Sequence, residues 1–195
     1  MDAHVLIPLK RLDSAKSRLG EALTPAARAS LMLDLMDGVV AAVRAAGVRR
    51  ITLVTSDDVA HPAADTWLDG NLPWNDALAR AADAVVAEEV VAVISADLPT
   101  LQATDVSSLL ERTPRRGIAI ARAHDGGTNA VSMRPPGVMP TLFGEPSSAT
   151  LHAEAARARG LSHVVLDLPG LAFDVDTPED LARMMAARGG ARDAA

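Results

Sequence analysis

Short apolar runs alternate with longer amphipathic segments along most of this chain of 195 residues. The apolar runs are rich in Val and Ile and are bounded by turn residues, which is typical of buried strands. These runs cover residues 4–9, 50–56, 90–95, 117–123, 129–134 and 162–168. Continuous apolar strands that alternate with helices predict an α/β fold with a mostly parallel sheet covered on both faces.

The segments between these runs carry helix signals. Thr24-Pro25 combines an N-cap residue with proline at the first helical position, and Gly47 ends the apolar periodicity that follows. Further helices are predicted at residues 74–88, 104–112, 147–159 and 177–188. We therefore predict a single doubly wound, Rossmann-like domain over residues 1–188, with a disordered tail over residues 189–195.

Composition narrows the class of protein. Hydrophobic residues make up 49% of the chain, but only two Phe and two Trp are present, so the core must be built mainly from aliphatic side chains. The absence of cysteine excludes disulfides and thiolate metal sites. A net charge of −6 opposes binding to nucleic acid. Since neither a signal peptide nor a run long enough for a membrane span is evident, we expect a cytoplasmic protein without a membrane partner.

The segment Asp125-Gly126-Gly127-Thr128-Asn129 lies between two predicted strands and has two interpretations. Asp-Gly and Gly-Gly are strong signals for an ordinary hairpin turn. Alternatively, Gly127 allows close approach of the backbone to a ligand, while Thr128 and Asn129 offer hydrogen-bond donors. The segment alone favours neither interpretation over the other.

Other polar residues follow the predicted strands, where a doubly wound sheet binds its ligands. The loop after the first strand carries Lys10, Arg11, Lys16 and Arg18 within nine residues of an otherwise acidic chain. Such a loop is either a solvated basic loop or a site that neutralises phosphates. Because the Walker A and dinucleotide glycine motifs are absent, phosphate binding would depend on these cations rather than on a glycine cradle.

Three carboxylates are candidate ligands for Mg²⁺. Asp97 follows a buried strand, and Asp174 and Asp176 lie on the same side of an extended segment. Asp97 could instead be a turn residue, and Asp176 could belong to a helix start at Asp-Thr-Pro-Glu. Two Mg²⁺ ions between three carboxylates would suit the transfer of a phosphoryl group.

Five motifs occur in an order that resembles the phospholactate/phosphoenolpyruvate guanylyltransferases of deazaflavin coenzyme (F-420) biosynthesis, which are similar to molybdenum-cofactor guanylyltransferase. The resemblance extends from Val5 to Leu181. The motifs are Lys10-x5-Lys16-Ser17-Arg18, Ala96-Asp97-Leu98-Pro99, Asp125-Gly126-Gly127-Thr128-Asn129-Ala130, Phe143-Gly144-x2-Ser147 and Asp174-x-Asp176-Thr177-Pro178-Glu179.

The resemblance implies a nucleotide-diphospho-sugar-transferase-like fold and a Mg²⁺-dependent guanylyltransferase. The phosphate of a three-carbon acid would attack the α-phosphorus of GTP, and pyrophosphate would leave. Phosphoenolpyruvate is the preferred acid, with 2-phospholactate and 3-phosphoglycerate as alternatives. A homodimer, and a downstream transferase that consumes the labile product, are the partners that the resemblance leaves open.

The resemblance also assigns roles. Lys10, Lys16 and Arg18 would hold the triphosphate, and Asp97 would bind Mg²⁺ together with Asp174 and Asp176. The acid would be bound by Thr128, Gly144 and Ser147, with the backbone of Gly127 close by, and Asn75 would approach the nucleoside.

The chain departs from the family in two places. The stretch between Asp58 and Asn75 is short. In the acid loop, Pro146 removes a backbone donor and Ser148 replaces an aromatic wall. Two other functions stay open at this point: a non-catalytic nucleotide-binding module, and a related transferase that uses another base or acceptor. The retained Lys16, Arg18 and Asp97 disfavour the module, and the Asp-Gly-Gly-Thr-Asn segment disfavours the other transferases.

Overall fold

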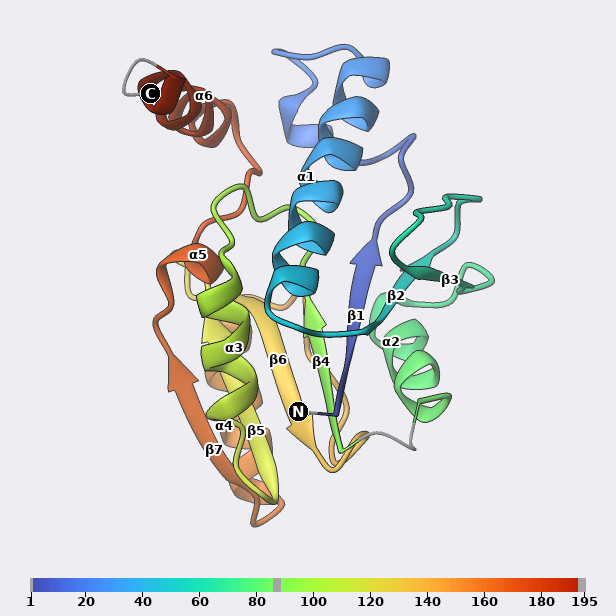
Figure 1. The fold of residues 1–195 in the computed structure, drawn as a ribbon, viewed down its shortest axis with the longest axis vertical. Helices are drawn as coiled ribbons and strands as arrows, with labels where there is room; N and C mark the ends of the chain where they lie inside the picture. Colours follow the sequence, from blue (N-terminus) through green and yellow to red (C-terminus); the bar gives the residue numbers. More distant parts are fainter. Residues whose placement is uncertain (1, 86–88, 193–195) are drawn as a thin grey trace.

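The computed structural model describes residues 2–85 and 89–192 of the chain (Figure 1). Within them, seven strands form one sheet in the order β3-β2-β1-β4-β6-β5-β7. The strands are β1 (Ala3–Leu9), β2 (Arg50–Thr55), β3 (Asp65–Leu68), β4 (Val90–Ile94), β5 (Gly117–Arg122), β6 (Thr128–Arg134) and β7 (Ser162–Leu166). All neighbours are parallel except that β6 is antiparallel to both β4 and β5. The predicted α/β class with a mostly parallel sheet is confirmed.

Helices cover both faces of this sheet (Figure 1). They are η1 (Ser17–Leu19), α1 (Pro25–Ala45), α2 (Trp74–Asp83), α3 (Ala103–Glu111), α4 (Ser148–Ala158), α5 (Pro169–Ala172) and α6 (Pro178–Arg192). Alternate residues of β1 belong to two different hydrophobic cores. Val5 and Ile7 pack with α1 and α3 on one face of the sheet, whereas Leu6 packs with α2 and α4 on the other. The doubly wound arrangement follows from this alternation.

Several elements differ from the sequence prediction. The helix predicted for residues 74–88 ends at Asp83, and residues 86–88 lie outside the described residues. Strand β3 was not predicted, because it is an edge strand whose residues are mostly exposed and give no apolar run. The α5 turn occupies part of the short run that precedes Asp174.

The C-terminal helix begins where the Asp-Thr-Pro-Glu signal indicated. Asp180 accepts hydrogen bonds from the backbone N–H groups of Thr177 and Asp176 at 2.8 and 3.2 Å, which fixes the first turn of α6. The helix continues to Arg192, beyond its predicted end at Arg188. The predicted disordered tail thus begins inside the helix, and it stays a prediction only for residues 193–195, which lie outside the described residues. In the described chain, no helix is long and apolar enough to cross a membrane.

Candidate active site

A cavity of about 680 Å³ opens at the carboxyl ends of β1 and β4. Because β6 runs in the opposite direction, it presents its first residues to the same cavity. The lining includes every residue to which the resemblance assigns a role except Asn75: Lys10, Lys16, Arg18, Asp97, Gly127, Thr128, Gly144, Ser147, Asp174 and Asp176. The rule that ligands bind beyond the strand ends therefore located this cavity from the sequence.

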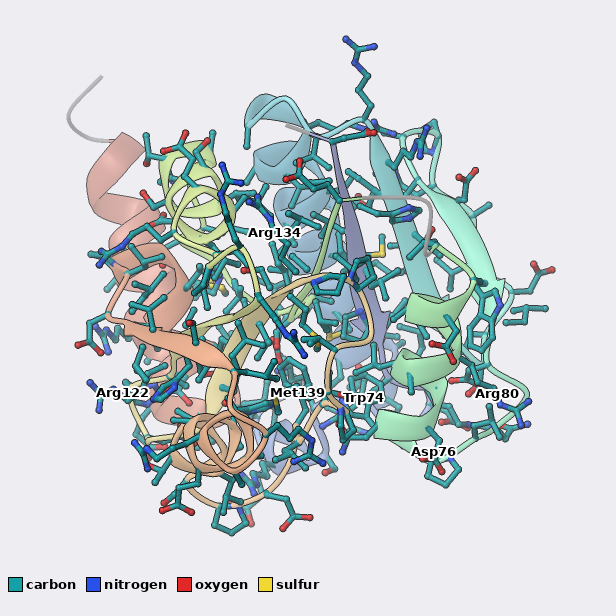
Figure 2. All side chains as sticks on the ribbon, turned by 90° about the horizontal axis from the view of Figure 1, so that it is seen from below. Trp74, Asp76, Arg80, Arg122, Arg134 and Met139 are labelled. Atoms are coloured by element: carbon teal, nitrogen blue, oxygen red, sulfur yellow. The ribbon has the colours of Figure 1, made fainter. Side chains whose placement is uncertain are left out.

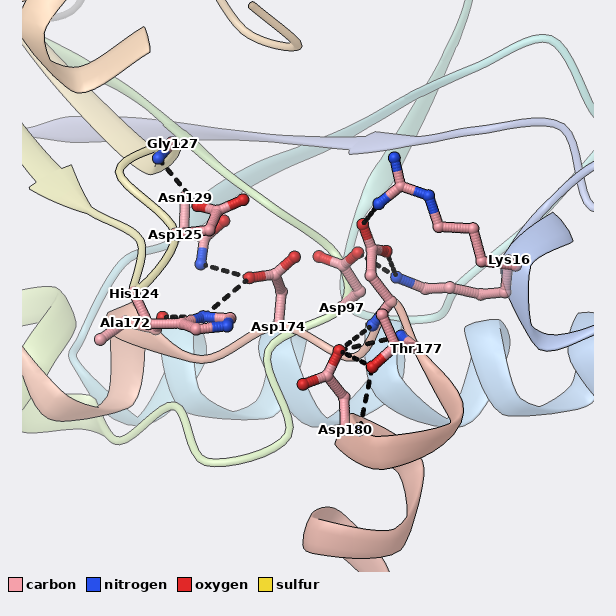
Figure 3. Close-up of polar contacts among 12 residues, drawn as sticks. Lys16, Asp97, His124, Asp125, Gly127, Asn129, Ala172, Asp174, Thr177 and Asp180 are labelled. Atoms are coloured by element: carbon pink, nitrogen blue, oxygen red, sulfur yellow. Dashed lines mark hydrogen bonds and ion pairs between the residues drawn. The ribbon is translucent and has the colours of Figure 1, made fainter. Parts of the chain in front are cut away.

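The three candidate carboxylates converge in this cavity and form what we call the carboxylate cluster. Asp97, Asp174 and Asp176 each offer an oxygen atom, and these atoms all lie within 4.8 Å of one another. Figure 3 shows the side chains of Asp97 and Asp174 side by side, next to Lys16. Carboxylate oxygens are hard donors, and three of them at this spacing fit Mg²⁺ or another small divalent cation.

Lys16 supplies a positive charge inside the carboxylate cluster. Its Nζ atom lies 2.9 Å from Asp176 Oδ1 and also contacts Asp97 Oδ2. Its side chain is only 4% exposed, and the residue has a left-handed backbone with φ of 52°. Arg18 lies further out, with Nη1 at 3.6 Å from Asp176. The left-handed backbone of Lys16 is a strained conformation for a non-glycine residue, and such strain is often retained at functional sites.

Burial and neighbouring charges shift the pKa values of Lys16 and of the cluster carboxylates in different directions. Burial would lower the pKa of Lys16, but the neighbouring Asp97 and Asp176 carboxylates outweigh it and raise that pKa. Burial would raise the pKa of Asp176, yet the Lys16 ammonium holds it below its ordinary value. Burial and the charge of Asp97 raise the pKa of Asp174. Asp174 is therefore the member of the cluster that most lacks a compensating cation.

The loop that carries Lys16 is anchored on the neighbouring strand. The N–H of Leu12 donates to Asp57 Oδ2 at 2.7 Å, so the carboxylate after β2 has a structural role. Arg11 turns away to an exposed ion pair with Asp13 at 2.7 Å, whereas the other three cations of the loop line the cavity. Lys10 Nζ lies 5.7 Å from the centre of the Trp74 ring.

The Asp125–Ala130 segment is a hairpin turn and also forms part of the cavity wall. It forms the turn of the β5–β6 hairpin, in which Gly126 has φ of 88° and Asp125 Oδ1 accepts the N–H of Gly127 at 2.8 Å. The same turn lines the cavity, and Asn129 Nδ2 donates to Asp174 Oδ1 at 3.1 Å. The turn geometry is thus what aims these polar groups at the carboxylate cluster (Figure 3).

The other side of the cavity contains the start of α4. Gly144 and Ser147 have left-handed backbones, with φ of 85° and 55°, just before the helix begins. The buried Ser148 hydroxyl donates to Thr128 Oγ1 at 2.9 Å, and His152 Nδ1 lies 3.2 Å from the same oxygen. Sequence reasoning missed His152, since a single histidine inside a helix gives no signal of its own.

Asn75 has a different environment from the one predicted. Its amide bonds the backbone of Phe143 and the hydroxyl of Thr141, and it does not line the cavity. The preceding residue, Trp74, lines the cavity instead. Figure 2 shows Trp74 turned toward the space between α2 and α4, whereas Asp76 and Arg80 of the same helix point outward.

Comparison with protein-family models identifies the family to which this chain belongs. Residues 3–193 match the model of the family described as Guanylyl transferase CofC like. The chain belongs to this family. It is 38% identical to phosphoenolpyruvate guanylyltransferase of Rubrobacter xylanophilus, over 97% of this chain and 96% of that protein. It is 35% identical to 2-phospho-L-lactate guanylyltransferase of Methanothermobacter thermautotrophicus, over 95% of this chain and 85% of that protein.

Solved structures share the fold of this guanylyl transferase family member at much lower identity. A nucleotidyl transferase from Methanothermobacter superposes with a TM-score of 0.73 at 15% identity, covering 95% of this chain and 97% of that one. A Mycobacterium tuberculosis protein solved in complex with manganese has a TM-score of 0.59 at 14% identity, covering 95% and 98%. These likenesses confirm the nucleotidyltransferase-like fold.

Proposed function

We propose that this protein transfers GMP from GTP to the phosphate of a three-carbon acid and releases pyrophosphate, as a step in the biosynthesis of the deazaflavin coenzyme F-420. Phosphoenolpyruvate is the preferred acid. The observation that carries the proposal is that one cavity joins a cationic loop, a carboxylate cluster and the start of helix α4. The likeness to phosphoenolpyruvate guanylyltransferase and to 2-phospho-L-lactate guanylyltransferase supports the same reaction.

The reaction needs positioning and charge neutralisation more than covalent help from the protein. An oxygen of the acid's phosphate forms a bond to the α-phosphorus of GTP. The bond from the α-phosphorus to the oxygen that bridges to the β-phosphorus breaks, and pyrophosphate leaves with that electron pair. Lys10, Lys16 and Arg18 all line the cavity and would neutralise the charge that develops on the leaving group.

The carboxylate cluster fits the divalent cation that this reaction requires. Asp97, Asp174 and Asp176 would hold Mg²⁺, and the manganese complex of a protein with the same fold supports the use of a divalent metal. When bound, the cation would offset negative charge on the nucleotide phosphates. The hydrogen bond from Asn129 orients Asp174, whereas Asp97 and Asp176 are paired with Lys16, which the cation would have to displace from them.

The two substrates are assigned to opposite sides of the cavity. Thr128, Gly144 and Ser147 would bind the phosphate and carboxylate of the acid, close to the positive end of the α4 helix. Trp74 offers the indole face against which the guanine base would stack, since Phe143, the other aromatic residue in the lining, is only 7% exposed.

Pyrophosphate release tests the proposal directly. The protein is incubated with Mg²⁺, each of the common nucleoside triphosphates and each of the three phosphorylated acids, and the nucleotide product is identified by mass. We expect release only with GTP and an acid, and fastest with phosphoenolpyruvate. Equal rates with ATP or CTP would exclude the guanylyl assignment. GTP binding without any release would identify a non-catalytic nucleotide-binding module.

A further inference from the structure

Phe143 and Gly144 line the cavity and belong to a short irregular segment, residues 141–144, which we call the strap. Among the described residues, the N–H groups of Leu142 and Phe143 donate to side chains and to no other backbone group. Thr141 and Phe143 are nevertheless buried, at 5% and 7% exposure. Buried backbone groups need partners, and here the partners are side chains from two helices.

Asn75, from the first turn of α2, holds the middle of the strap. Its Oδ1 atom accepts the N–H of Phe143 at 3.0 Å and the hydroxyl of Thr141 at 2.9 Å. Its Nδ2 atom donates to the carbonyl of Phe143 at 3.1 Å. This side chain thus takes the place that a neighbouring strand would take, by pairing with both backbone groups of one residue.

His152, from α4, holds the strap from the other side. Its Nε2 atom accepts the N–H of Leu142 at 2.9 Å, so the ring proton must reside on Nδ1. That proton is donated to the carbonyl of Ser148 at 2.8 Å, and Nδ1 also lies 3.2 Å from Thr128 Oγ1. His152 is fully buried, and burial lowers its pKa, which favours this neutral form.

The same contacts determine which hydrogen bond the Thr128 hydroxyl can form with a ligand. Its hydroxyl oxygen accepts from Ser148 at 2.9 Å, and His152 Nδ1, whose proton goes to the Ser148 carbonyl, lies 3.2 Å away. Neither contact uses the hydroxyl hydrogen of Thr128, which remains available for donation. An acceptor-rich substrate such as a phosphate or a carboxylate is what this arrangement would recognise.

We propose that Asn75 and His152 are positioning residues that set the affinity for the acid without touching it, by holding the strap and the Thr128 hydroxyl in their binding geometry. This inference rests on the proposed function, because it takes the acid to bind at Thr128, Gly144 and Ser147. A slack strap displaces Gly144 directly and leaves unchanged the cationic loop after β1 and the carboxylate cluster, whose members follow β4 and α5. The effect should therefore appear in the constant for the acid and not in that for GTP.

Steady-state kinetics on paired variants test the proposal. Asn75→Ala removes all three bonds, and His152→Phe keeps a ring but has no acceptor for Leu142. We expect each to raise the KM for the acid about tenfold, the scale of one or two lost hydrogen bonds. The KM for GTP should stay within about twofold, a change of about 0.4 kcal/mol. His152→Gln, whose amide oxygen can accept from Leu142, should restore most of the affinity.

A control variant separates positioning from general destabilisation. Thr113→Val removes a buried hydroxyl that bonds Ser132 on β6, away from the cavity. It should lower the melting temperature without raising the KM for the acid. The proposal is overturned if that KM follows melting temperature across all variants, if the KM for GTP rises equally, or if His152→Gln behaves like His152→Phe.

Failure of the proposed function has a different signature. If the wild type shows no acid-dependent turnover, the substrate assignment is wrong, and amide hydrogen exchange then tests the strap by itself. Exchange at Phe143 should accelerate in Asn75→Ala, and exchange at Leu142 should accelerate in His152→Phe. Unchanged protection of both amides would show that these side chains do not hold the strap.

Discussion

Replacing Lys16 with methionine perturbs the charge balance at the centre of the cavity. The ammonium contacts Asp97 and lies 2.9 Å from Asp176, and the side chain that carries it is almost completely buried. Methionine keeps much of the length but leaves the carboxylate cluster without an internal cation. The three carboxylates would then repel one another across distances of no more than 4.8 Å between their closest oxygen atoms.

The expected loss in free energy of unfolding depends on how exposed the carboxylate partners of Lys16 are. Breaking a buried ion pair by removing one partner costs about 3–5 kcal/mol. We expect about 2 kcal/mol here, because the Asp176 side chain is 46% exposed and water screens its charge. In a chain of this length, that loss corresponds to a fall of roughly 4–8 °C in melting temperature.

Mg²⁺ should reverse part of this loss. In the wild type Lys16 competes with a divalent cation for Asp97 and Asp176, whereas in Lys16→Met all three carboxylates are available. A ligand that binds only the folded state raises its stability in proportion to its affinity. The melting temperature of Lys16→Met should therefore rise more on addition of Mg²⁺ than that of the wild type, even though its turnover falls by about two orders of magnitude.

Thermal unfolding followed by circular dichroism, with and without Mg²⁺ at low ionic strength, measures both effects. Lys10→Met is the matched control, since it removes a cation of the same cavity whose ammonium lies over the Trp74 ring. Its melting temperature should stay close to that of the wild type. Equal melting temperatures for wild type and Lys16→Met, or equal responses of the two to Mg²⁺, would refute the charge balance described here.

Three further predictions concern the metal, the base and the pH dependence of stability. Asp97→Asn should lower turnover by about a hundredfold, as expected for a lost electrostatic contributor, while the protein still folds; near wild-type turnover would make Asp97 a turn residue only. Trp74→Ala should raise the KM for GTP by roughly five- to a hundredfold, the scale of one lost base stack, and GTP should quench tryptophan fluorescence in Trp67→Phe but not in Trp74→Phe. Burial lowers the pKa of both His4 and His152 from the ordinary 6.5, so the unfolded chain binds more protons than the folded one below about that pH. The free energy of unfolding should thus fall between neutral and mildly acidic pH in denaturant titrations, less steeply in His152→Gln; a flat profile would contradict neutral, buried imidazoles.

The sequence predicted the parts of the site that depend on strand ends and short motifs. The apolar runs located β1 and β4, and the residues that follow them, Lys10 and Asp97, line the cavity. The hairpin could also be read from Asp125-Gly126-Gly127, because its turn chemistry is local.

The contacts between distant segments could not be read in the same way. Asn75 bonds the backbone of Phe143, which lies 68 positions later in the sequence. No sequence pattern predicts that a side chain will pair with an irregular segment so far away. His152 gives no periodic or spacing signal, and its role appears only once α4 is placed beside Thr128. Strand β3 escaped prediction for a related reason, since an exposed edge strand lacks the apolar run of a central one.

The long sequence separation within the carboxylate cluster has a consequence for synthesis of the chain. Lys16 and its partner Asp176 are 160 residues apart. At a ribosomal rate of roughly 5–20 residues per second, Asp176 would be made about 8–32 s after Lys16. During that interval the nascent chain can pair β1 with β2, but Lys16 lacks its Asp176 partner. Any chain that is cut short before Asp174 would therefore retain much of the sheet and yet lack two of the three carboxylates that complete the cavity.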